Sequence, residues 1–252
     1  SNYDMLDKLR KGLQTPIRVT IPPGSRPEVV AAVAARSMAF PEEDVLGALN
    51  DTSRTHSIGT DTAHVFGFML PETYFFYWLT DASRVVATIK EEFDKRYATL
   101  LSESNAAVEL SPEEATIIAS IVEWETAIEE EKPRVAGVYL NRLRSGWRLQ
   151  ADPTVQFAIL QREGSKRRLF FRDYRIDHPY NTYLFRGLPP GPITNPSASS
   201  IRAVLEPEKH DYYYFVARGD GSHIFSRTLR EHNQNANAYR RLMRQRRAEQ
   251  AG

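Results

Sequence analysis

The feature that most constrains the fold is a helix start at Ser111. Glu114 follows Ser111 at the spacing of a capping box, and Pro112 occupies the first helical position, so three signals agree. At about 100° per residue, the apolar residues that follow fall on one stripe. These residues are Ile117, Ile118, Ile121 and Val122. The stretch predicts a helix with a well-defined beginning and one buried face.

The apolar stripe of this helix includes a carboxyl group. Glu125 falls on the middle of the stripe, where a leucine would be the ordinary residue. Burial disfavours the charged form of a carboxyl group and raises its pKa, so the group can donate a proton near neutral pH. Glu125 is therefore the candidate general acid. The alternative is a buried ion pair between Glu125 and an arginine such as Arg142 or Arg148, since ion pairs also perturb pKa values.

A second acid lies on the opposite side of the same helix. Glu123 shares that side with small or weakly polar residues, namely Thr116, Ala119, Ser120 and Thr126. Such a face allows a ligand or another backbone segment to approach closely. The two glutamates are therefore predicted to lie in different environments.

Composition sets wide limits on function. The chain has 252 residues, of which 41% are hydrophobic, enough for one large or two small domains with a core. Its 33 basic and 32 acidic side chains give no overall electrostatic argument for binding nucleic acid or an anionic membrane. The absence of cysteine excludes disulfides and thiolate metal sites. No signal peptide and no apolar run of about 18 residues is present.

The first part of the chain predicts short elements. A strand and two helices are expected at residues 17–21, about 26–36 and about 41–49. Residues 51–63 are polar without a usable period and predict a loop or a subdomain boundary. The aromatic-rich residues 66–78 could form a sugar platform, but core packing is the favoured interpretation. Residues 81–101 predict an amphipathic helix, followed by a polar loop at 102–109.

The second part is predicted to combine helices with irregular loops. A helix at 133–145 follows an acidic turn at 129–132, which is interpreted as solvated and not metal-binding. Residues 162–175 form a basic loop interleaved with aromatic residues, and a carboxylate-bearing ligand is favoured there over nucleic acid. Residues 180–196 contain four prolines and two glycines, which predicts a rigid loop that presents side chains.

The C-terminal segment predicts a hairpin and a helix. The strands are expected at residues 212–216 and 223–226, on either side of a glycine-containing turn. The tail at 231–249 is helical and basic, and its arginines are interpreted as a solvated face. His223 and His232 lie near the hairpin, and a lone histidine is more often structural than catalytic.

Motif searches remove several chemistries. The sequence has no HExxH pair, no glycine-rich phosphate loop and no GxSxG elbow, so we expect no metal and no cofactor. What is left is an acid and a set of amide and hydroxyl donors that suit a sugar chain. These donors are Asn141, Gln150, Tyr180, Asn181 and Tyr183. A glycoside hydrolase normally needs a second carboxyl group, for which Asp152 and Glu123 are the nearby candidates.

Several long stretches resemble the endolytic murein transglycosylase, or YceG-like, family. They are ASIVEWET (119–126), VYLNRLRSGWRLQADPTV (138–155), PYNTYLFRGLPPGPITNP (179–196) and YYFVARGDGSHIFSRTLREHN (213–233). GFMLPETYFF (67–76) resembles the same family. The resemblance implies cleavage of the MurNAc-β-1,4-GlcNAc bond within glycan strands, leaving a 1,6-anhydro end. The catalytic glutamate of the family's E-x-E-T motif corresponds to Glu125.

In such a reaction the C6 hydroxyl group of the sugar attacks C1, so a single residue serves as acid and then as base. Asp152 then becomes a structural or binding residue. The residues expected to bind the glycan are Glu123, Asn141, Arg142, Gln150, Asp152, Tyr180, Asn181, Thr182, Tyr183, Pro189, His223, Ser226 and Asn233. The open alternatives are a hydrolytic muramidase and a non-catalytic peptidoglycan-binding protein.

The predicted fold class is α+β, with a helical catalytic domain, a small hairpin and an N-terminal βαα unit. The resemblance implies that residues 1–62 are a LysM-like peptidoglycan-binding region, 63–105 a connecting segment and 106–252 the catalytic domain. It also implies action at the outer face of the cytoplasmic membrane, through a single-pass anchor that is expected natively but absent from this sequence. Peptidoglycan synthases are candidate partners, and nucleic acid is not.

Overall fold

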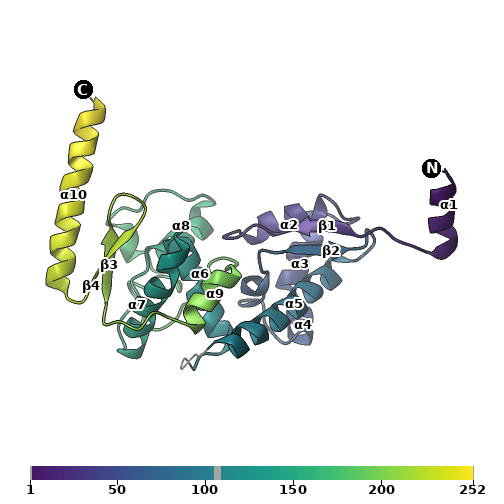
Figure 1. Cartoon of the computed structure of the whole chain (residues 1–252), viewed down its shortest axis with the longest axis horizontal. Coiled ribbons are helices and arrows are strands. Elements are labelled where there is room, and N and C mark those ends of the chain that lie inside the picture. The colour runs from purple at the N-terminus through teal and green to yellow at the C-terminus, as the bar shows by residue number, and fades with distance from the viewer. Residues whose placement is uncertain (1, 105–108, 252) are drawn as a thin grey trace.

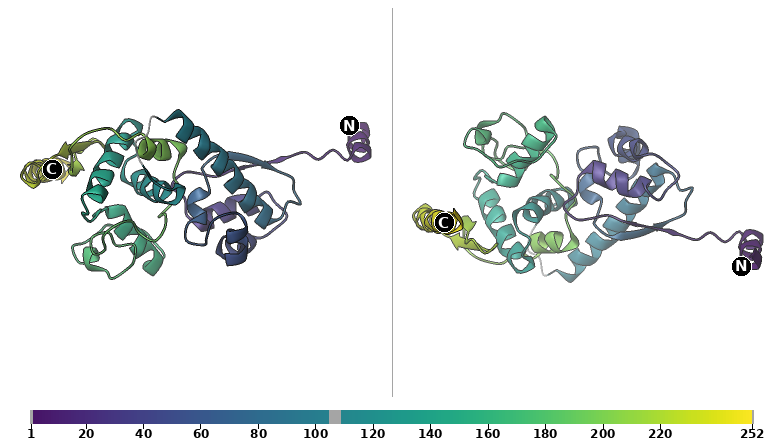
Figure 2. Two further views of the ribbon diagram at one scale, coloured as in Figure 1. Left: turned by 90° about the horizontal axis from the view of Figure 1, so that it is seen from below. Right: turned by 90° about the horizontal axis from the view of Figure 1, so that it is seen from above.

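The computed structural model of the protein describes residues 2–104 and 109–251 (Figure 1). The molecule is elongated and has an N-terminal and a C-terminal lobe, with the two chain ends at opposite extremes (Figures 1 and 2). The predicted α+β class is confirmed. The centre of the polar loop predicted at 102–109 lies outside the described residues.

The N-terminal lobe contains a two-stranded sheet with helices between its strands. Strand β1 (Ile17–Thr20) pairs antiparallel with β2 (Thr73–Phe76), and Ile17 lies opposite Phe76. Helices α2 (Pro27–Ala35) and α3 (Glu42–Asn50) follow β1, as predicted. Because β2 belongs to the aromatic segment, the N-terminal unit uses residues on both sides of residue 62, and more than the two predicted helices lie between its strands.

The loop predicted at 51–63 is wrong in part, because a short helix, α4 (Thr52–Ser57), lies within it. The Asp51 carboxylate caps this helix by accepting a hydrogen bond from the Arg54 amide at 3.1 Å. Thr55 is its buried residue. A six-residue helix with no apolar stripe leaves no period in the sequence, so only the cap could have indicated it.

The aromatic segment at 66–78 is mostly core, as favoured. Phe68 lies in the short 3₁₀ helix η1 (Val65–Phe68) and is buried, as are Tyr74 and Phe76 on one face of β2. Phe75 lies on the other face and is exposed, as expected from the alternation of side chains along a strand. Tyr77 and Trp78 after the strand are also exposed.

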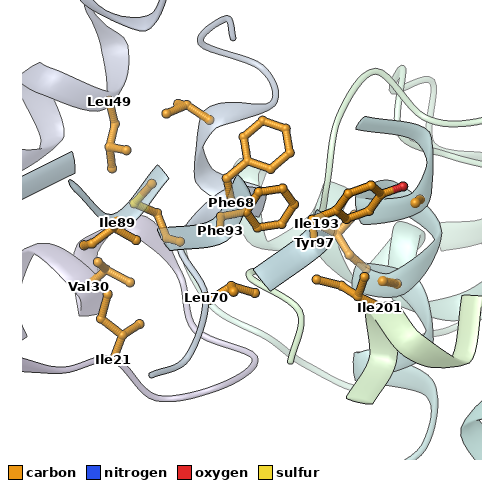
Figure 3. Close-up of a cluster of buried hydrophobic side chains, with 14 of the residues drawn as sticks. Ile21, Val30, Leu49, Phe68, Leu70, Ile89, Phe93, Tyr97, Ile193 and Ile201 are labelled. Carbon is orange, nitrogen blue, oxygen red and sulfur yellow. The ribbon is translucent and has the colours of Figure 1, made fainter. Parts of the chain in front are cut away.

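Helix α5 (Ala82–Glu103) connects the two lobes through one hydrophobic core. Its buried face includes Ile89, Phe93 and Tyr97, at the spacing the sequence predicted. Figure 3 shows this row continuing from N-lobe side chains, such as Ile21, to Ile201 of the C-lobe. The lobes are thus joined by packed side chains and do not meet only at a linker.

The C-terminal lobe is built around the predicted helix at Ser111. Helix α6 (Pro112–Glu125) begins with the expected capping box, in which the Ser111 hydroxyl group and the Glu114 carboxylate bond each other's backbone amides. It packs against α7 (Lys132–Arg144), α8 (Asp152–Glu163) and α9 (Ala198–Leu205). Helix α7 was predicted, whereas α8 and α9 were not. The 3₁₀ helices η2 (Glu129–Glu131) and η3 (Asp173–Arg175) complete this lobe.

The predicted hairpin and C-terminal helix are confirmed. Strands β3 (Tyr214–Ala217) and β4 (His223–Ser226) pair antiparallel, and α10 (Leu229–Ala251) packs against both. Helix α10 forms one end of the molecule, and α1 (Asn2–Lys11) projects from the other (Figure 1). Within the described ranges, no helix is both long enough and apolar enough to cross a membrane.

Candidate active site

Glu125 lies where two clefts meet. The larger, here named the hairpin cleft, has a volume of about 1060 Å³. It is lined by Glu125, Tyr139, Arg142, Gln150, Asp152, Phe171, Arg172, Tyr174, Arg175, Tyr183, Tyr214, Phe215, Val216, Ala217, His223, Leu229, His232, Ala236, Tyr239 and Arg240.

The smaller cleft, here named the N-lobe cleft, has a volume of about 530 Å³. It is lined by Pro23, Gly24, Glu123, Trp124, Glu125, Asp152, Pro153, Gln156 and Lys166. Glu125 and Asp152 line both clefts, so the two form one groove with Glu125 near its middle. A long polymer could therefore extend on both sides of this carboxyl group.

The environment of Glu125 favours its protonated form. Glu125 is the last residue of α6, where the buried stripe of the helix reaches the groove. Burial raises the pKa of its carboxyl group to about 7. The hydrogen bond from the Tyr139 hydroxyl group to Oε2, 2.9 Å long, lowers the pKa, and the nearby charge of Asp152 raises it. A group with a pKa near neutrality can both donate and accept a proton under physiological conditions.

Glu125 is not held in an ion pair. Within the described ranges no arginine, lysine or histidine lies within 4.0 Å of its carboxylate. Arg142 lies nearby, but it donates to the carbonyl oxygen of Tyr213 at 2.8 Å and to that of Leu149. Arg148 is exposed. The alternative of a structural Glu125–arginine pair is therefore wrong.

Asp152 lines both clefts with Glu125 and is held by two phenol groups. The hydroxyl groups of Tyr183 and Tyr174 donate to its two carboxylate oxygens at 2.5 Å and 3.2 Å. Burial, and then the charge of Asp152, raise the pKa of both phenols. Asp152 thus adds negative charge to the groove with both of its oxygens already hydrogen-bonded.

Glu123 points away from the groove centre, toward the beginning of α9. Its Oε2 atom accepts hydrogen bonds from the Ser197 amide at 2.9 Å, the Ser197 hydroxyl group at 2.5 Å and the Ser200 hydroxyl group at 2.6 Å. The Lys132 ammonium group lies 3.7 Å away. The small face predicted for this side of α6 is therefore occupied by another segment of backbone, and Glu123 is well placed to stabilise that contact.

The acidic turn predicted at 129–132 is only partly solvated. Glu131 is buried, and its two carboxylate oxygens bond the backbone amide and ring Nδ1 of His223 at 2.9 Å and 2.8 Å. This pair attaches strand β4 to η2, directly before α7. The interpretation of the whole run as solvated was wrong for Glu131, because its partner is distant in sequence. His223 itself lines the hairpin cleft.

Among the residues predicted to bind glycan, five line the hairpin cleft. They are Arg142, Gln150, Asp152, Tyr183 and His223. Gln150 has a left-handed backbone conformation, with φ of 49°, although it is not glycine. Its amide donates to the Thr182 carbonyl oxygen at 3.1 Å, which holds this strained residue in place. The loop at 180–196 and the start of α8 are therefore joined directly beneath the groove.

Four other predicted residues support the site from outside the groove. The Asn141 amide group bonds the carbonyl oxygens of His210 and Tyr212 at 2.9 Å and 3.1 Å. Asn181 and Thr182 are buried and bond neighbouring segments of the loop and α8. Ser226 is buried and accepts a hydrogen bond from Asn235. Their contacts are structural, so direct contact with the glycan is not supported for them.

Tyr180, Pro189 and Asn233 also lie outside the two clefts. The Tyr180 ring packs on Phe157 with centroids 4.6 Å apart, and Pro189 is buried. Asn233 is exposed on α10. The second half of the loop at 180–196 instead joins the lobes, because Gly191 lies so close to the Ala63 carbonyl oxygen that a Cβ atom would be 2.4 Å from it.

Sequence reasoning missed several aromatic residues of the hairpin cleft. Tyr139 lies on the buried face of α7, and a phenol at such a position needs a hydrogen-bond partner, which was the available signal. Tyr214 of β3 stacks against His232 of α10 with centroids 5.4 Å apart. Burial first, then Arg142 and Arg240, lower the pKa of His232, which favours its neutral form. Tyr239 also lines the cleft, and no sequence pattern placed α10 there.

The basic loop predicted at 162–175 divides between two roles. Arg167 is bound by Glu163 at 2.8 Å and Asp173 at 2.7 Å, and these partners hold the loop together. Arg172 and Arg175 line the hairpin cleft, whereas Lys166 lines the N-lobe cleft. In the described part of the chain, no cluster of three histidine, aspartate or glutamate residues is arranged to hold a metal ion.

Comparisons with known sequences give a consistent result. The profile of the YceG-like family matches residues 1–238. A Bacillus subtilis strain 168 protein named endolytic murein transglycosylase is 30% identical over 88% of this chain and 65% of its own length. A Streptococcus pneumoniae strain D39 protein of the same name is 31% identical over 67% of this chain and 31% of its own length. The chain thus spans less than two thirds of these curated relatives.

The fold has a solved counterpart. A crystal structure of a YceG-like protein from Listeria monocytogenes matches with a TM-score of 0.73 and 29% identity, over 93% of this chain and 80% of that one. Both lobes are included in a match of this extent. The family profile, the relatives and the fold agree, and this chain belongs to the YceG-like family.

Proposed function

We propose that this protein is an endolytic murein transglycosylase with Glu125 as its catalytic residue. The observation that carries the proposal is a carboxyl group with a pKa of about 7 at the middle of a long groove. The names of the relatives in Bacillus and Streptococcus support the substrate, murein. The bond proposed for cleavage is the β-1,4 bond between N-acetylmuramic acid and N-acetylglucosamine.

In the first step, protonated Glu125 donates its proton to the glycosidic oxygen, and the bond from that oxygen to C1 of the muramic acid breaks. The leaving N-acetylglucosamine departs with a new 4-hydroxyl group. Glu125 is then a carboxylate. The hydrogen bond from Tyr139 stabilises this charged form and orients the carboxyl group, which is a positioning role for Tyr139.

In the second step, the C6 hydroxyl oxygen of the same muramic acid bonds to C1, and the hydroxyl proton passes to Glu125. The product is a 1,6-anhydro ring, and Glu125 is again protonated. No water is consumed and no second carboxyl group is needed. A pKa near 7 suits a group that alternates between these two states.

The groove supports an endolytic mode of cleavage. Glycan residues on both sides of the broken bond can be accommodated, because one cleft extends toward the hairpin and α10 and the other toward the N-terminal lobe. An enzyme that acts only at strand ends needs a closed side. Glu125 and Asp152, which line both clefts, lie between the hairpin cleft and the N-lobe cleft.

A hydrolytic muramidase is less well supported. Its second carboxyl group would be Asp152 or Glu123. Both oxygens of Asp152 accept phenol hydrogen bonds, and the accepting oxygen of Glu123 is bound by Ser197 and Ser200. Both carboxylates are therefore engaged in hydrogen bonds within the protein. A purely binding protein would not require a carboxyl group with a raised pKa in its groove.

The N-terminal lobe is proposed to bind glycan as a LysM-like unit, since α2 and α3, followed by the short α4 and η1, lie between two paired strands. A murein substrate implies action in the cell envelope. The outer face of the cytoplasmic membrane, a single-pass anchor and contact with peptidoglycan synthases are part of the same proposal, and they rest on the family resemblance.

Digestion of purified sacculi tests the reaction. Wild-type protein should release fragments ending in 1,6-anhydro muramic acid, detected by mass spectrometry, and Glu125→Gln should release almost none. Internal cleavage should shorten long strands before small products accumulate. Reducing ends carrying ¹⁸O from labelled water would instead identify a hydrolase, and the absence of any product would leave a binding protein.

A further inference from the structure

The N-lobe cleft contains a cation that has no acidic partner within the described residues. The Lys166 ammonium group lies over the ring of Trp124, 3.2 Å from its centroid. The indole NH of Trp124 donates to the Gly24 carbonyl oxygen at 3.2 Å, which fixes the ring that the ammonium group faces. A ring can orient a cation without neutralising it. The charge of Lys166 therefore remains available to a ligand.

The other charged groups of this cleft are hydrogen-bonded within the protein or have a proposed role. Glu123 is held by Ser197 and Ser200, and Asp152 by two tyrosines. Glu125 at the junction is the proposed catalytic acid. Lys166 is thus the cation that lines the N-lobe cleft, and no described residue pairs with it.

A second cation, Arg26, follows the cleft residues Pro23 and Gly24 in the turn before α2, outside the cleft lining. Partial burial and then the charge of the Arg26 guanidinium group lower the pKa of Lys166. The only acid within 4.0 Å of Arg26 among the described residues is Glu28, at 3.9 Å and largely exposed. Two cations with weak or no pairing, one in the cleft and one beside it, favour the binding of an anion.

The N-lobe wall of this cleft is rigid. The Asn195 side chain accepts from the Ser25 amide at 2.7 Å and donates to the Pro22 carbonyl oxygen at 3.2 Å. Thr194 donates to the Ser25 carbonyl oxygen at 2.7 Å. The turn between β1 and α2 is therefore held by the C-lobe loop.

We propose that the N-lobe cleft is a subsite for the peptide stem of murein, in which Lys166, assisted by Arg26, binds a stem carboxylate. This inference rests on the proposed function and specifies its substrate. Murein differs from other β-1,4-linked amino-sugar polymers in carrying peptides with free carboxylates on alternate sugars. A cationic subsite beside the catalytic residue would select strands that carry such stems.

The test is a binding measurement with uncleaved ligand. Glycan–peptide oligomers are prepared with their stem carboxylates either free or converted to amides, and each is titrated into Glu125→Gln protein by calorimetry. We expect the free-carboxylate ligand to bind about 3- to 10-fold more tightly, as is typical of a partly exposed charged contact. This preference should shrink with added salt.

Lys166→Gln, made in the same Glu125→Gln protein, should bind both ligands equally, at the affinity of the amidated one. Arg26→Gln should reduce the preference by a smaller factor. Arg168→Gln is the matched control, because Arg168 is an exposed residue of the same loop outside the cleft lining, and it should keep the full preference.

The inference would be overturned if Glu125→Gln protein bound the free-carboxylate and amidated ligands equally. It would also be overturned if the preference for the free-carboxylate ligand persisted after Lys166→Gln. An equal loss in the Arg168→Gln control would also overturn it, because general charge of the loop would then explain the effect. Since these measurements require no turnover, failure of the sacculus digestion would count against the proposed function alone.

Discussion

The two sides of helix α6 show how one short segment creates two different environments. On one side, Glu123 meets the beginning of α9 and is bound by Ser197, Ser200 and Lys132. On the other, Glu125 meets an open groove and receives a hydrogen bond from Tyr139. The residues are identical in type and two positions apart. Their difference shows that the tertiary partner of a carboxyl group, and not its chemistry alone, assigns its role.

The largest effect should follow from removing the proton donor. Glu125→Gln keeps the shape and the hydrogen bond to Tyr139 but cannot exchange a proton, so the cleavage rate on sacculi should fall by about 10²- to 10⁴-fold. Glu130→Gln, a change at an exposed acid near the same helix end, should leave the rate unchanged. If Glu125→Gln and wild type cleaved sacculi at comparable rates, Glu125 would not be the proton donor, and its proposed difference in role from Glu123 would be wrong.

A substitution on the opposite side of α6, at Glu123, should lower the stability of the protein. Glu123→Ala leaves the Ser197 and Ser200 hydroxyl groups without their acceptor and removes a charge from beside buried Lys132, which should lower the free energy of unfolding by about 2–4 kcal/mol. Urea denaturation measures this loss, with Glu130→Ala as the exposed control, expected within about 0.5 kcal/mol of wild type. If Glu123→Ala lost activity without losing stability, the structural role assigned to Glu123 would be wrong.

Replacing Glu125 should raise stability, in contrast to replacing Glu123, and the gain should depend on pH. Its folded pKa of about 7 lies above the ordinary value of 4.5, so a charged, buried carboxylate destabilises the wild type above pH 7 and this penalty disappears as the pH falls toward 4.5. Glu125→Gln should therefore be more stable than wild type by about 1–3 kcal/mol at pH 8. The gain should vanish at pH 4.5. Denaturation curves at both pH values would reveal a constant difference if burial is not the cause.

The smallest effects should be two opposite changes in the pH–rate profile. Activity should decline as the pH rises through about 7, because the first step needs protonated Glu125. Tyr139→Phe removes a hydrogen bond that lowers this pKa and should move the decline upward by about half a pH unit. Asp152→Asn removes a charge that raises it and should move the decline downward by a smaller amount. Movement in the same direction for both variants would contradict the assignment.

Local signals in the sequence predicted much of the framework. The capping box at Ser111, the apolar stripe on α5 and the hairpin turn each depend on residues that are close together in the sequence. Their patterns can therefore be recognised from the sequence alone. The phase of α6 also separated Glu123 from Glu125. Helix α4 was missed because it has a cap but no period, and the partner of β1 was missed because strand pairing joins residues far apart.

The residues that surround Glu125 in its cleft were harder to predict than Glu125 itself. Arg142, Gln150, Asp152, Tyr183 and His223 were expected near Glu125 and line its cleft. Tyr139 and Tyr239 were not expected, and Asn141, Asn181 and Ser226 instead form structural hydrogen bonds. A polar residue type reports what bonds a side chain can make, whereas the direction of the side chain depends on which segments pack around it.

By itself, the sequence determined the position of the buried acid, because helical phase is a local property of consecutive residues. Only the tertiary structure decided that this acid lies at the junction of two clefts, that Asp152 lines the same clefts with both oxygens bound, and that Lys166 lies over Trp124 without an acidic partner among the described residues. These relations join α6 to α8, the hairpin and the N-terminal lobe, and such long-range packing leaves no periodic trace along the chain.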